Sequence, residues 1–295
     1  MGTSYNVMSA SEDGSIRQWT RDREPVGEPW RGDGRPVVSL AVSPDATMVA
    51  SGGADGRLRV WNIQGGRVVG DPLEGHTAPA MCLDWSSNGQ EIASGSIDGT
   101  VRRWNPGTGR QIGPRIETGG LVNTIRYSPQ SDKFATGGYA GKIRVWSMDS
   151  KLLIEIKGHD DWVNSLCWSK DGAYIFSGSS DRTIRKWHLI DGKEVFVLRG
   201  HTHAVSSICV SLDQRHLFSA SYDSSVRIWD LKTNRQVGDP LLHKDRLLTV
   251  VLSSDGRYIT SAGSEEKIYI WSLEAALKQA GAQVRAHIAT SLHVL

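Results

Sequence analysis

The sequence lacks the features that mark several large classes of protein. Its 34 lysines and arginines are balanced by 32 aspartates and glutamates, and a net charge of +2 argues against a dedicated nucleic-acid binder. No run of about 18 apolar residues occurs, so we expect no membrane-spanning helix. The first 30 residues lack the basic and then apolar pattern of a secretory signal. We therefore expect a cytoplasmic protein.

Cysteine is also scarce, and the common metal and nucleotide motifs are missing. The three cysteines cannot all pair with one another, and no Cys-x-x-Cys occurs, so we expect them to be reduced and to pack as small apolar groups. No P-loop, HExxH or EF-hand loop is present. The sequence therefore supports no metal site and no cofactor.

Tryptophan, by contrast, is abundant and regularly spaced. There are 11 tryptophans against 4 phenylalanines, and seven of the tryptophans follow one another at intervals of 42, 43, 42, 41, 42 and 42 residues. These seven are Trp19, Trp61, Trp104, Trp146, Trp187, Trp229 and Trp271. A period of this length indicates a solenoid, a propeller or another repeat array.

Each repeat reads as four β-strands. The segments that end at the periodic tryptophan, such as SIRQW and TVRRW, alternate in hydrophobicity, as strands do. Upstream, runs such as EIASGSIDG end in a turn rich in glycine, serine and aspartate, which predicts a hairpin. A third strand (VVSLAV, VNSLCW) precedes this hairpin, and a fourth (GRVVGDPL, KLLIEI, KEVFVL) follows the tryptophan. Four strands in about 42 residues leave no room for a helix.

These features resemble the WD-repeat family, whose repeats carry Gly-His near the start and Trp-Asp near the end. Gly-His occurs three times, whereas only Trp229 is followed by aspartate, Asp230. The resemblance implies an all-β, seven-bladed β-propeller of four-stranded antiparallel blades, forming a single domain over residues 1–295. The segments VVGDPLEGHT and VGDPLLHKD further resemble the WD-repeat regions of fungal NACHT-type signalling NTPases, where the propeller is thought to sense or inhibit.

Three repeats carry a full set of His, Ser, Asp and Trp. A Ser/His/Asp set can form a nucleophilic triad, but three copies of one active site in one chain would be unusual. The family resemblance instead implies a structural tetrad that ties the turn of each blade to its strands, so we expect no catalytic residue and no enzyme. The three predicted tetrads are His76, Ser94, Asp98 and Trp104; His159, Ser177, Asp181 and Trp187; and His201, Ser219, Asp223 and Trp229.

The fourth repeat departs most from this pattern. Ala140 replaces the turn aspartate, Thr136 replaces the serine, and no histidine is present. We expect blade four to be the least rigid, because it lacks the hydrogen-bonded network. In the seventh repeat, Glu265 is expected to replace the turn aspartate in part.

The two chain ends suggest how the ring closes. Residues 288–295 align with the innermost strands of other repeats, whereas the first repeat starts without one. We expect residues 273–281 to form a short helix and residues 288–295 to supply the inner strand of blade one. A second possibility remains, since the apolar residues from Leu273 to Leu292 also fit a helix lying outside the ring.

The family resemblance places partner binding on one face of the disc, formed by the loops that lead into the inner strands and by the turns before the aspartates. Aromatic and arginine side chains are the types that anchor interfaces. The candidate contact residues on these segments are Trp162, Tyr222, Tyr139, Arg246 and His203.

We therefore expect a monomeric, non-catalytic scaffold that binds a protein or peptide. The alternative is a carbohydrate-binding or enzymatic propeller that uses the mouth of the channel. An arginine also recurs two residues before the tryptophan in six repeats, but alternation places it on the same sheet face as that tryptophan. We expect these arginines to serve packing or pairing rather than nucleic-acid binding.

Overall fold

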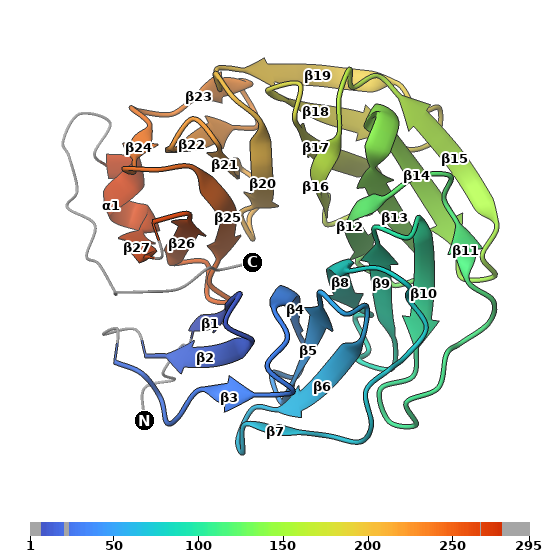
Figure 1. The fold of residues 1–295 in the computed structure, drawn as a ribbon. Coiled ribbons are helices and arrows are strands. Elements are labelled where there is room, and N and C mark those ends of the chain that lie inside the picture. The colour runs from blue at the N-terminus through green and yellow to red at the C-terminus, as the bar shows by residue number, and fades with distance from the viewer. Residues whose placement is uncertain (1–6, 21–23, 266, 279–295) are drawn as a thin grey trace.

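Seven antiparallel β-sheets stand as blades around a central axis (Figure 1). This computed structural model describes residues 7–20, 24–265 and 267–278. The expected fold class, a seven-bladed all-β propeller, is confirmed. Each sheet follows the order of its strands in the chain, so the blades are meanders in which consecutive strands are hydrogen-bonded neighbours, except that β24 of blade six pairs with β22.

The inner and second strands of the blades are the more regular ones. Alternating apolar residues put one row of side chains on each face of the sheet, and the second strands are buried over most of their length. The inner strands are β4 (Val37–Val42), β8 (Ala80–Trp85), β12 (Val122–Tyr127), β16 (Val163–Trp168), β20 (Val205–Val210) and β25 (Leu247–Leu252). The second strands are β1 (Val7–Ala10), β5 (Met48–Gly53), β9 (Ile92–Ser96), β13 (Lys133–Gly138), β17 (Tyr174–Ser179), β21 (His216–Ser221) and β26 (Tyr258–Gly263).

The third strand of each blade ends in or just after the periodic tryptophan, and in blades one to six an outer strand follows it. The third strands are β2 (Ser15–Trp19), β6 (Leu58–Asn62), β10 (Thr100–Trp104), β14 (Lys142–Ser147), β18 (Thr183–His188), β22 (Ser225–Asp230) and β27 (Ile268–Ser272). The outer strands are β3 (Trp30–Arg31), β7 (Arg67–Val68), β11 (Ile116–Glu117), β15 (Leu152–Lys157), β19 (Glu194–Arg199), β23 (Arg235–Gln236) and β24 (Leu241–Leu242).

In the part of the chain that the structure describes, the outer position is a continuous strand only in blades four and five, where β15 and β19 each span six residues. In blades two and six a Gly-Asp-Pro segment interrupts it, because proline has no N–H to donate and the glycine takes a positive φ. The chain then returns to the third strand, through a bridge between Leu73 and Leu58 in blade two and through β24 in blade six.

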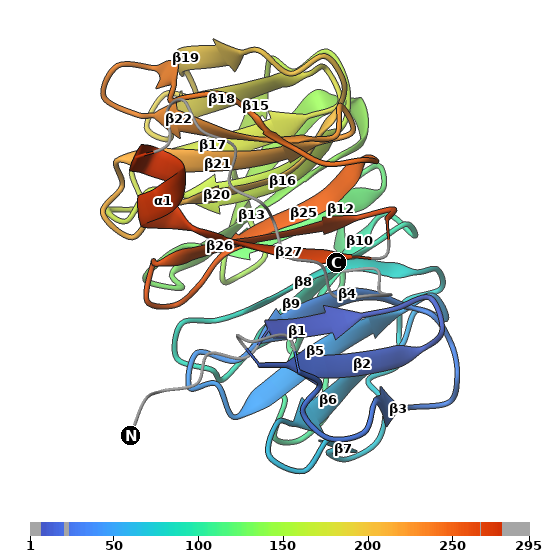
Figure 2. The same cartoon turned by 90° about the vertical axis from the view of Figure 1, so that its left-hand side faces the viewer.

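Blades one and seven lie next to each other and close the ring (Figure 2). Trp19 of blade one packs with Ala262 and Ile268 of blade seven in one hydrophobic cluster. The helix α1 (Leu273–Lys278) follows β27, and no helix in the described part of the chain is long and apolar enough to cross a membrane. Residues 279–281 of the expected helix and the expected closing strand, residues 288–295, lie outside the described residues.

The hydrophobic core is divided among the seams between blades. Each of the seven clusters of buried apolar residues draws its members from two neighbouring blades, and each contains the periodic tryptophan of the later blade of the pair. Close approach at the seam between blades four and five requires a glycine. A Cβ on Gly137 would lie 2.6 Å from Cγ1 of Val163.

Candidate binding face

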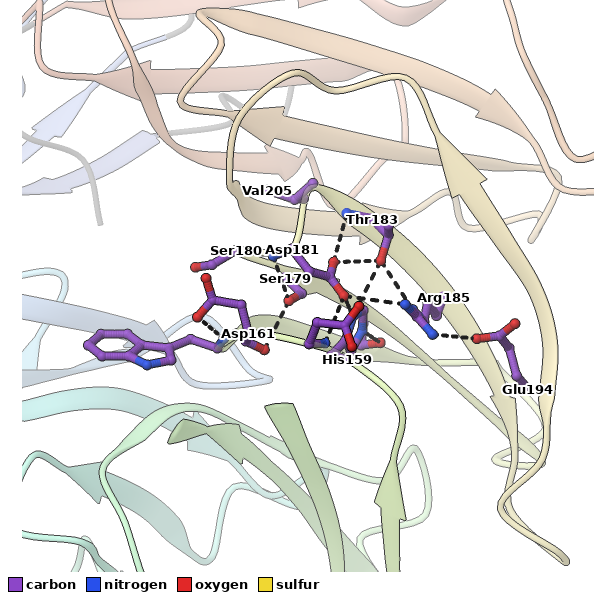
Figure 3. Close-up of polar contacts among 12 residues, drawn as sticks. His159, Asp161, Ser179, Ser180, Asp181, Thr183, Arg185, Glu194 and Val205 are labelled. Atoms are coloured by element: carbon purple, nitrogen blue, oxygen red, sulfur yellow. Dashed lines mark hydrogen bonds and ion pairs between the residues drawn. The ribbon is translucent and has the colours of Figure 1, made fainter. Parts of the chain in front are cut away.

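The four side chains of each predicted tetrad lie within hydrogen-bonding distance of one another. In blade five, His159 Nδ1 is 2.7 Å from Asp181 Oδ2 and its Nε2 is 2.6 Å from Ser177 Oγ, which accepts a 2.7 Å bond from the indole N–H of Trp187. Figure 3 shows His159 and Asp181 with the surrounding network, in which Thr183 donates to the same carboxylate.

The tetrads of blades three and six repeat this geometry. The distances from histidine Nδ1 to aspartate, from histidine Nε2 to serine, and from indole nitrogen to serine are 3.0, 2.7 and 2.9 Å in blade three. They are 2.8, 2.7 and 2.8 Å in blade six. The serines of all three tetrads are fully buried, so none of them can act as a nucleophile toward an external substrate. The arrangement is that of a structural clamp.

The hydrogen bonds of the clamp also fix its charge state. Burial opposes ionisation of Asp98, but the hydrogen bonds from Thr100 and from the backbone N–H of Thr77 outweigh it and lower the pKa of Asp98 to about 2. Burial lowers the pKa of His76, and the Asp98 carboxylate opposes that shift only in part. At neutral pH the clamp of blade three is therefore a neutral imidazole between a carboxylate and a hydroxyl.

The aspartate of each clamp also holds the loop that leads into the inner strand. Its carboxylate accepts a hydrogen bond from the backbone N–H of the residue after the histidine. This bond measures 3.0 Å from Thr77 in blade three and 3.3 Å from Asp160 in blade five. The loop and the turn of a blade are thus tied together at one end of the sheet, and residues displayed by these two segments have a rigid support.

Blade seven contains a rearranged clamp. The Glu265 carboxylate accepts the backbone N–H groups of Lys244 and Asp245. In blades three, five and six the clamp aspartate accepts the N–H at the position of Lys244. His243, however, is 2.9 Å from Ser261 Oγ through Nε2 and donates from Nδ1 to the carbonyl of Leu241. The hydroxyl of Tyr269 donates a 2.7 Å hydrogen bond to the second oxygen of the Glu265 carboxylate. Glu265 therefore replaces the aspartate toward the loop and not toward the histidine.

Blade four contains the smallest remnant of the clamp. The indole N–H of Trp146 still donates to Thr136 Oγ1 at 2.9 Å. The strand register places Thr118 where blade three has His76, and Ala140 where it has Asp98. Neither Thr118 nor Ala140 can supply the missing imidazole or carboxylate.

In each of blades two to seven, a backbone hydrogen bond joins the turn to the residue that enters the inner strand. The residue before the turn aspartate, or before its replacement, donates to the residue that precedes the inner strand. The bonds run from Ala54 to Pro36, Ile97 to Pro79, Tyr139 to Leu121, Ser180 to Trp162, Tyr222 to Ala204 and Ser264 to Arg246, at 2.8–3.2 Å. These twelve residues therefore lie on one face of the disc, which we call the clamp face.

Tyr139 and Trp162, two of the predicted contact residues, form an aromatic pair on the clamp face. Their ring centroids are 6.4 Å apart at 66°, an edge-to-face arrangement across the seam between blades four and five. Tyr139 is 55% exposed and Trp162 is 41% exposed. Trp162 thus packs against Tyr139 and still presents a large apolar surface to solvent.

The other predicted contact residues lie on blades six and seven. The Arg246 guanidinium is 5.9 Å from the ring of Tyr222, and its Nε donates to Ser264 Oγ at 3.1 Å. Tyr222 is 42% exposed. His203 is exposed in the loop that enters β20, where its carbonyl accepts a bond from Ser221. The structure thus places all five residues on blades four to seven of the clamp face.

Two features of this face were not predicted as contact sites. Ile97 is 46% exposed at the position equivalent to Tyr139. Its position directly before the turn aspartate could have indicated this in the sequence. A pocket of about 80 Å³ lies in blade four, lined by residues that include Thr118, Thr136, Lys142 and Arg144. The missing histidine of the fourth repeat was the signal for this pocket.

The recurring arginines take part in pairing with nearby side chains. Arg185 contacts Glu194 at 2.8 Å, and Arg144 contacts Glu155 at 2.8 Å. Arg227 donates to Gln236 at 2.6 Å. Their guanidinium groups are thus engaged within their own blades, which is not the solvated basic stripe that phosphate contacts require.

The structure offers little for chemistry at the channel. In the six described inner strands, Asp84 is the one carboxylate, and it contacts Arg126 at 3.7 Å and accepts the N–H of Tyr127. Paired carboxylates, which glycoside hydrolysis requires, do not occur there. Among the described residues no three metal-ligating side chains come together. The cysteines are free, and burial raises the pKa of Cys82 and Cys209 to about 12.

Comparison with known proteins agrees with this architecture. The profile of the family described as "WD domain, G-beta repeat" matches residues 24–62, 67–105, 113–147, 150–188, 192–230 and 241–272. These six matches run from the outer strand of blade one to the third strand of blade seven.

Curated proteins of several kinds are similar to parts of the chain. It is 28% identical over 191 residues to the small ribosomal subunit protein RACK1y of Oryza sativa, covering 62% of this chain and 44% of that protein. It is 37% identical over 70 residues to the nuclear distribution protein PAC1 of Arthroderma benhamiae, covering 24% and 15%. It is 38% identical over 89 residues to protein HIRA of Dictyostelium discoideum, covering 25% and 8%.

The chain thus covers less than half the length of these three relatives, and none of their names is that of an enzyme. The family profile matches well over half of the chain, and each match spans the outer strand of one blade and the first three strands of the next. The chain is a member of the WD-repeat family.

Proposed function

We propose that this propeller is a non-catalytic scaffold that binds a partner protein or peptide on the clamp face. The observation that carries the proposal is the set of exposed aromatic and arginine side chains on blades four to seven, held on turns that backbone hydrogen bonds fix in place. Rigid aromatic anchors lose little conformational entropy on binding, and such residues dominate the energetics of interfaces.

The similarity to known proteins supports the same proposal. RACK1y is by its name a protein of the small ribosomal subunit, which is a larger assembly. We extend the proposal to a cytoplasmic monomer that acts through its partner and holds no cofactor. The alternative, a lectin-like or enzymatic propeller, has no specific observation in its favour, because the described inner strands contain one carboxylate and that group is paired.

A finer proposal concerns the setting in which the scaffold acts. The two Gly-Asp-Pro segments, which interrupt the outer strands of blades two and six, resemble those of the propellers of fungal NACHT-type NTPases. On this basis we propose that the propeller senses or inhibits within a signalling system. Identification of a signalling NTPase among the proteins bound through the clamp face would support this, and partners unrelated to signalling would exclude it.

The test of the scaffold is capture from native lysate by the wild type and by Trp162→Ala and Tyr222→Ala variants. We expect both substitutions to weaken capture of the same partner about tenfold or more, since interface aromatics contribute at least about 1.4 kcal/mol each when they are anchors. The matched control is Ile190→Ala, because Ile190 is 86% exposed in the turn between β18 and β19, at the opposite end of the blade.

Three outcomes separate the possibilities. Loss of one partner in the two face variants, with capture retained by Ile190→Ala, supports the scaffold on the clamp face. Equal loss in all three variants places binding elsewhere or reflects misfolding, and circular dichroism of each variant distinguishes these. Absence of a protein partner together with binding on a glycan array would establish the carbohydrate-binding alternative.

A further inference from the structure

The pocket in blade four occupies the place where other blades contain their clamp. Its lining combines Thr118 and Thr136, which stand at the histidine and serine positions, with the backbone of Gly119 and Gly120. In blade three the corresponding space is filled by the imidazole of His76, which is buried between Ser94 and Asp98. Blade four has kept the walls of this compartment and lost the two side chains that fill it.

The charge of the compartment has also changed. Lys142 stands where Thr100 of blade three donates to the clamp carboxylate at 2.7 Å. Arg144 stands at the position of Arg102, and both cations line the pocket. Blade four has therefore lost the aspartate and gained a lysine, which leaves the site that held an anion facing two cations.

Glu155 on the outer strand neutralises these cations only in part. Its carboxylate contacts Arg144 at 2.8 Å, Lys142 at 3.3 Å and Lys157 at 3.4 Å. Three cations share this one carboxylate. The adjacent loop of blade five carries Asp160 and Asp161, but the Asp161 carboxylate accepts the N–H of Trp162 instead. The pocket thus retains positive charge that a further anion would balance.

Size and position restrict what can enter. A volume of about 80 Å³ holds several water molecules but is well below the roughly 300 Å³ of an ordinary small-molecule site. Tyr139 and Leu121 also line the pocket, and both belong to the clamp face. The opening therefore lies beside the aromatic pair of Tyr139 and Trp162.

We propose that this pocket receives the carboxylate of an aspartate or glutamate side chain of the bound partner, which contacts Lys142 and Arg144 in the place of the missing clamp aspartate. The proposal rests on the proposed function, because the carboxylate is presented by a partner that binds the clamp face. It adds a requirement for an acidic residue next to the apolar contact made by Trp162.

The first experiment uses a small carboxylate and needs no partner. Acetate is titrated into the full chain, and the backbone amides of Gly119, Gly120 and Ala140 are followed by NMR, with sodium chloride at equal ionic strength as the reference. We expect saturable shifts with acetate alone. Thr118→His, which fills the pocket with an imidazole, is expected to abolish them, and Lys142→Gln is expected to weaken acetate binding several-fold.

The matched control for Lys142→Gln is Arg57→Gln. Arg57 follows the turn aspartate of blade two by two residues, as Lys142 follows Ala140, and it forms an exposed pair with Glu74. Its removal deletes one positive charge at the equivalent position, so acetate binding is expected to stay within twofold of the wild type. An equal effect of both glutamine variants, or no saturable shift in the wild type, overturns the proposal.

The second experiment selects peptides from a random display library on the wild-type propeller. Peptides that depend on Trp162 are expected to carry an acidic residue at a fixed position, and to lose about tenfold in affinity on Lys142→Gln, because truncating one member of a buried charge pair is costly. Lys142 is partly exposed, so we expect Lys142→Gln to fold. This variant therefore keeps the test valid if Thr118→His does not fold.

The two experiments separate failure of the pocket from failure of the proposed function. Trp162-dependent peptides without an acidic position, bound equally well by Lys142→Gln, overturn the pocket and leave the scaffold intact. If acetate binds saturably but no selected peptide depends on Trp162, the pocket binds anions and the clamp face does not bind a partner. That result overturns the proposed function and, with it, the assignment of the pocket to a partner's carboxylate.

Discussion

Blades four and five have the same strands, the same continuous outer strand and adjacent seams, yet they differ in what holds their turns. Blade five has a complete clamp from His159 to Trp187, whereas blade four keeps one bond, from Trp146 to Thr136. In blade four the turn contains two successive residues with positive φ, Ala140 and Gly141; in blade five only Arg182 of the turn has one. Blade four thus takes its place in the ring without a complete clamp, so a complete clamp is not required to position a blade.

The largest expected effect is the removal of a clamp histidine. His159→Ala is expected to lower the free energy of unfolding by about 3–5 kcal/mol, because the nearly buried Asp181 carboxylate loses its partner and a cavity opens. Urea denaturation followed by tryptophan fluorescence measures this. Thr118→Ala at the equivalent position of blade four serves as the control, with an expected loss of about 1 kcal/mol. Equal losses in the two variants would show that the clamp adds nothing to the seams.

A pH dependence of intermediate size is expected from blade seven, whose histidine contacts a carbonyl instead of a carboxylate. Burial lowers the pKa of His243 from 6.5 to about 4, and the Leu241 carbonyl and Glu265 offset this only in part. An unfolded His243 takes up a proton below pH 6.5, whereas the folded one stays neutral until about pH 4. The stability contributed by His243 is therefore complete above pH 6.5 and is lost as the pH falls to 4, by up to about 3 kcal/mol.

The measurement is the free energy of unfolding of the wild type and of His243→Gln across that pH range. The variant is expected to show a shallower decline, whereas His203→Gln on the exposed loop should follow the wild type. A decline that is unchanged in His243→Gln would mean that the rearranged clamp of blade seven does not control this titration.

The smallest expected effect is a difference in local opening. Amides of β13 in blade four are expected to exchange with solvent more readily than those of β17 in blade five, with an opening free energy lower by about 1–2 kcal/mol. Hydrogen exchange followed by mass spectrometry resolves the two strands, and β21 of blade six, which has a complete clamp, is the reference. Equal protection of β13 and β17 would contradict the expectation that blade four is the least rigid.

Much of the fold could be predicted from the sequence, because the same strand and turn patterns recur in seven repeats. The tryptophan period and the Gly/Ser/Asp turns predict blades and strands, and the spacing of His159, Ser177 and Asp181 predicts their meeting, since antiparallel register fixes which positions face each other. Outer strands were less predictable. The same alternating residues form a continuous strand or a broken one according to a single proline, such as Pro72 or Pro240.

The site was predictable only in part. Residues that depart from the repeat occur once each, so no regular spacing indicates which other residues they contact. The sequence marked Trp162 and Tyr139 separately, but their edge-to-face contact depends on the geometry of the seam between two blades. It marked Glu265 as a substitute for aspartate, but the extra methylene carries the carboxylate to Tyr269 instead of to His243. In the sequence, blade four only lacks a histidine, whereas the structure shows that a pocket lies at the position of the missing side chain.

Because every apolar cluster is shared by two neighbouring blades, the consequences of a substitution stay local. A change in blade four alters its seams with blades three and five and leaves the far side of the disc with its packing intact, so energetic effects on opposite sides should add independently. Such modularity gives one sector of the molecule freedom to vary. A blade can give up its internal polar network and acquire a recognition pocket while the remaining seams keep the disc in shape.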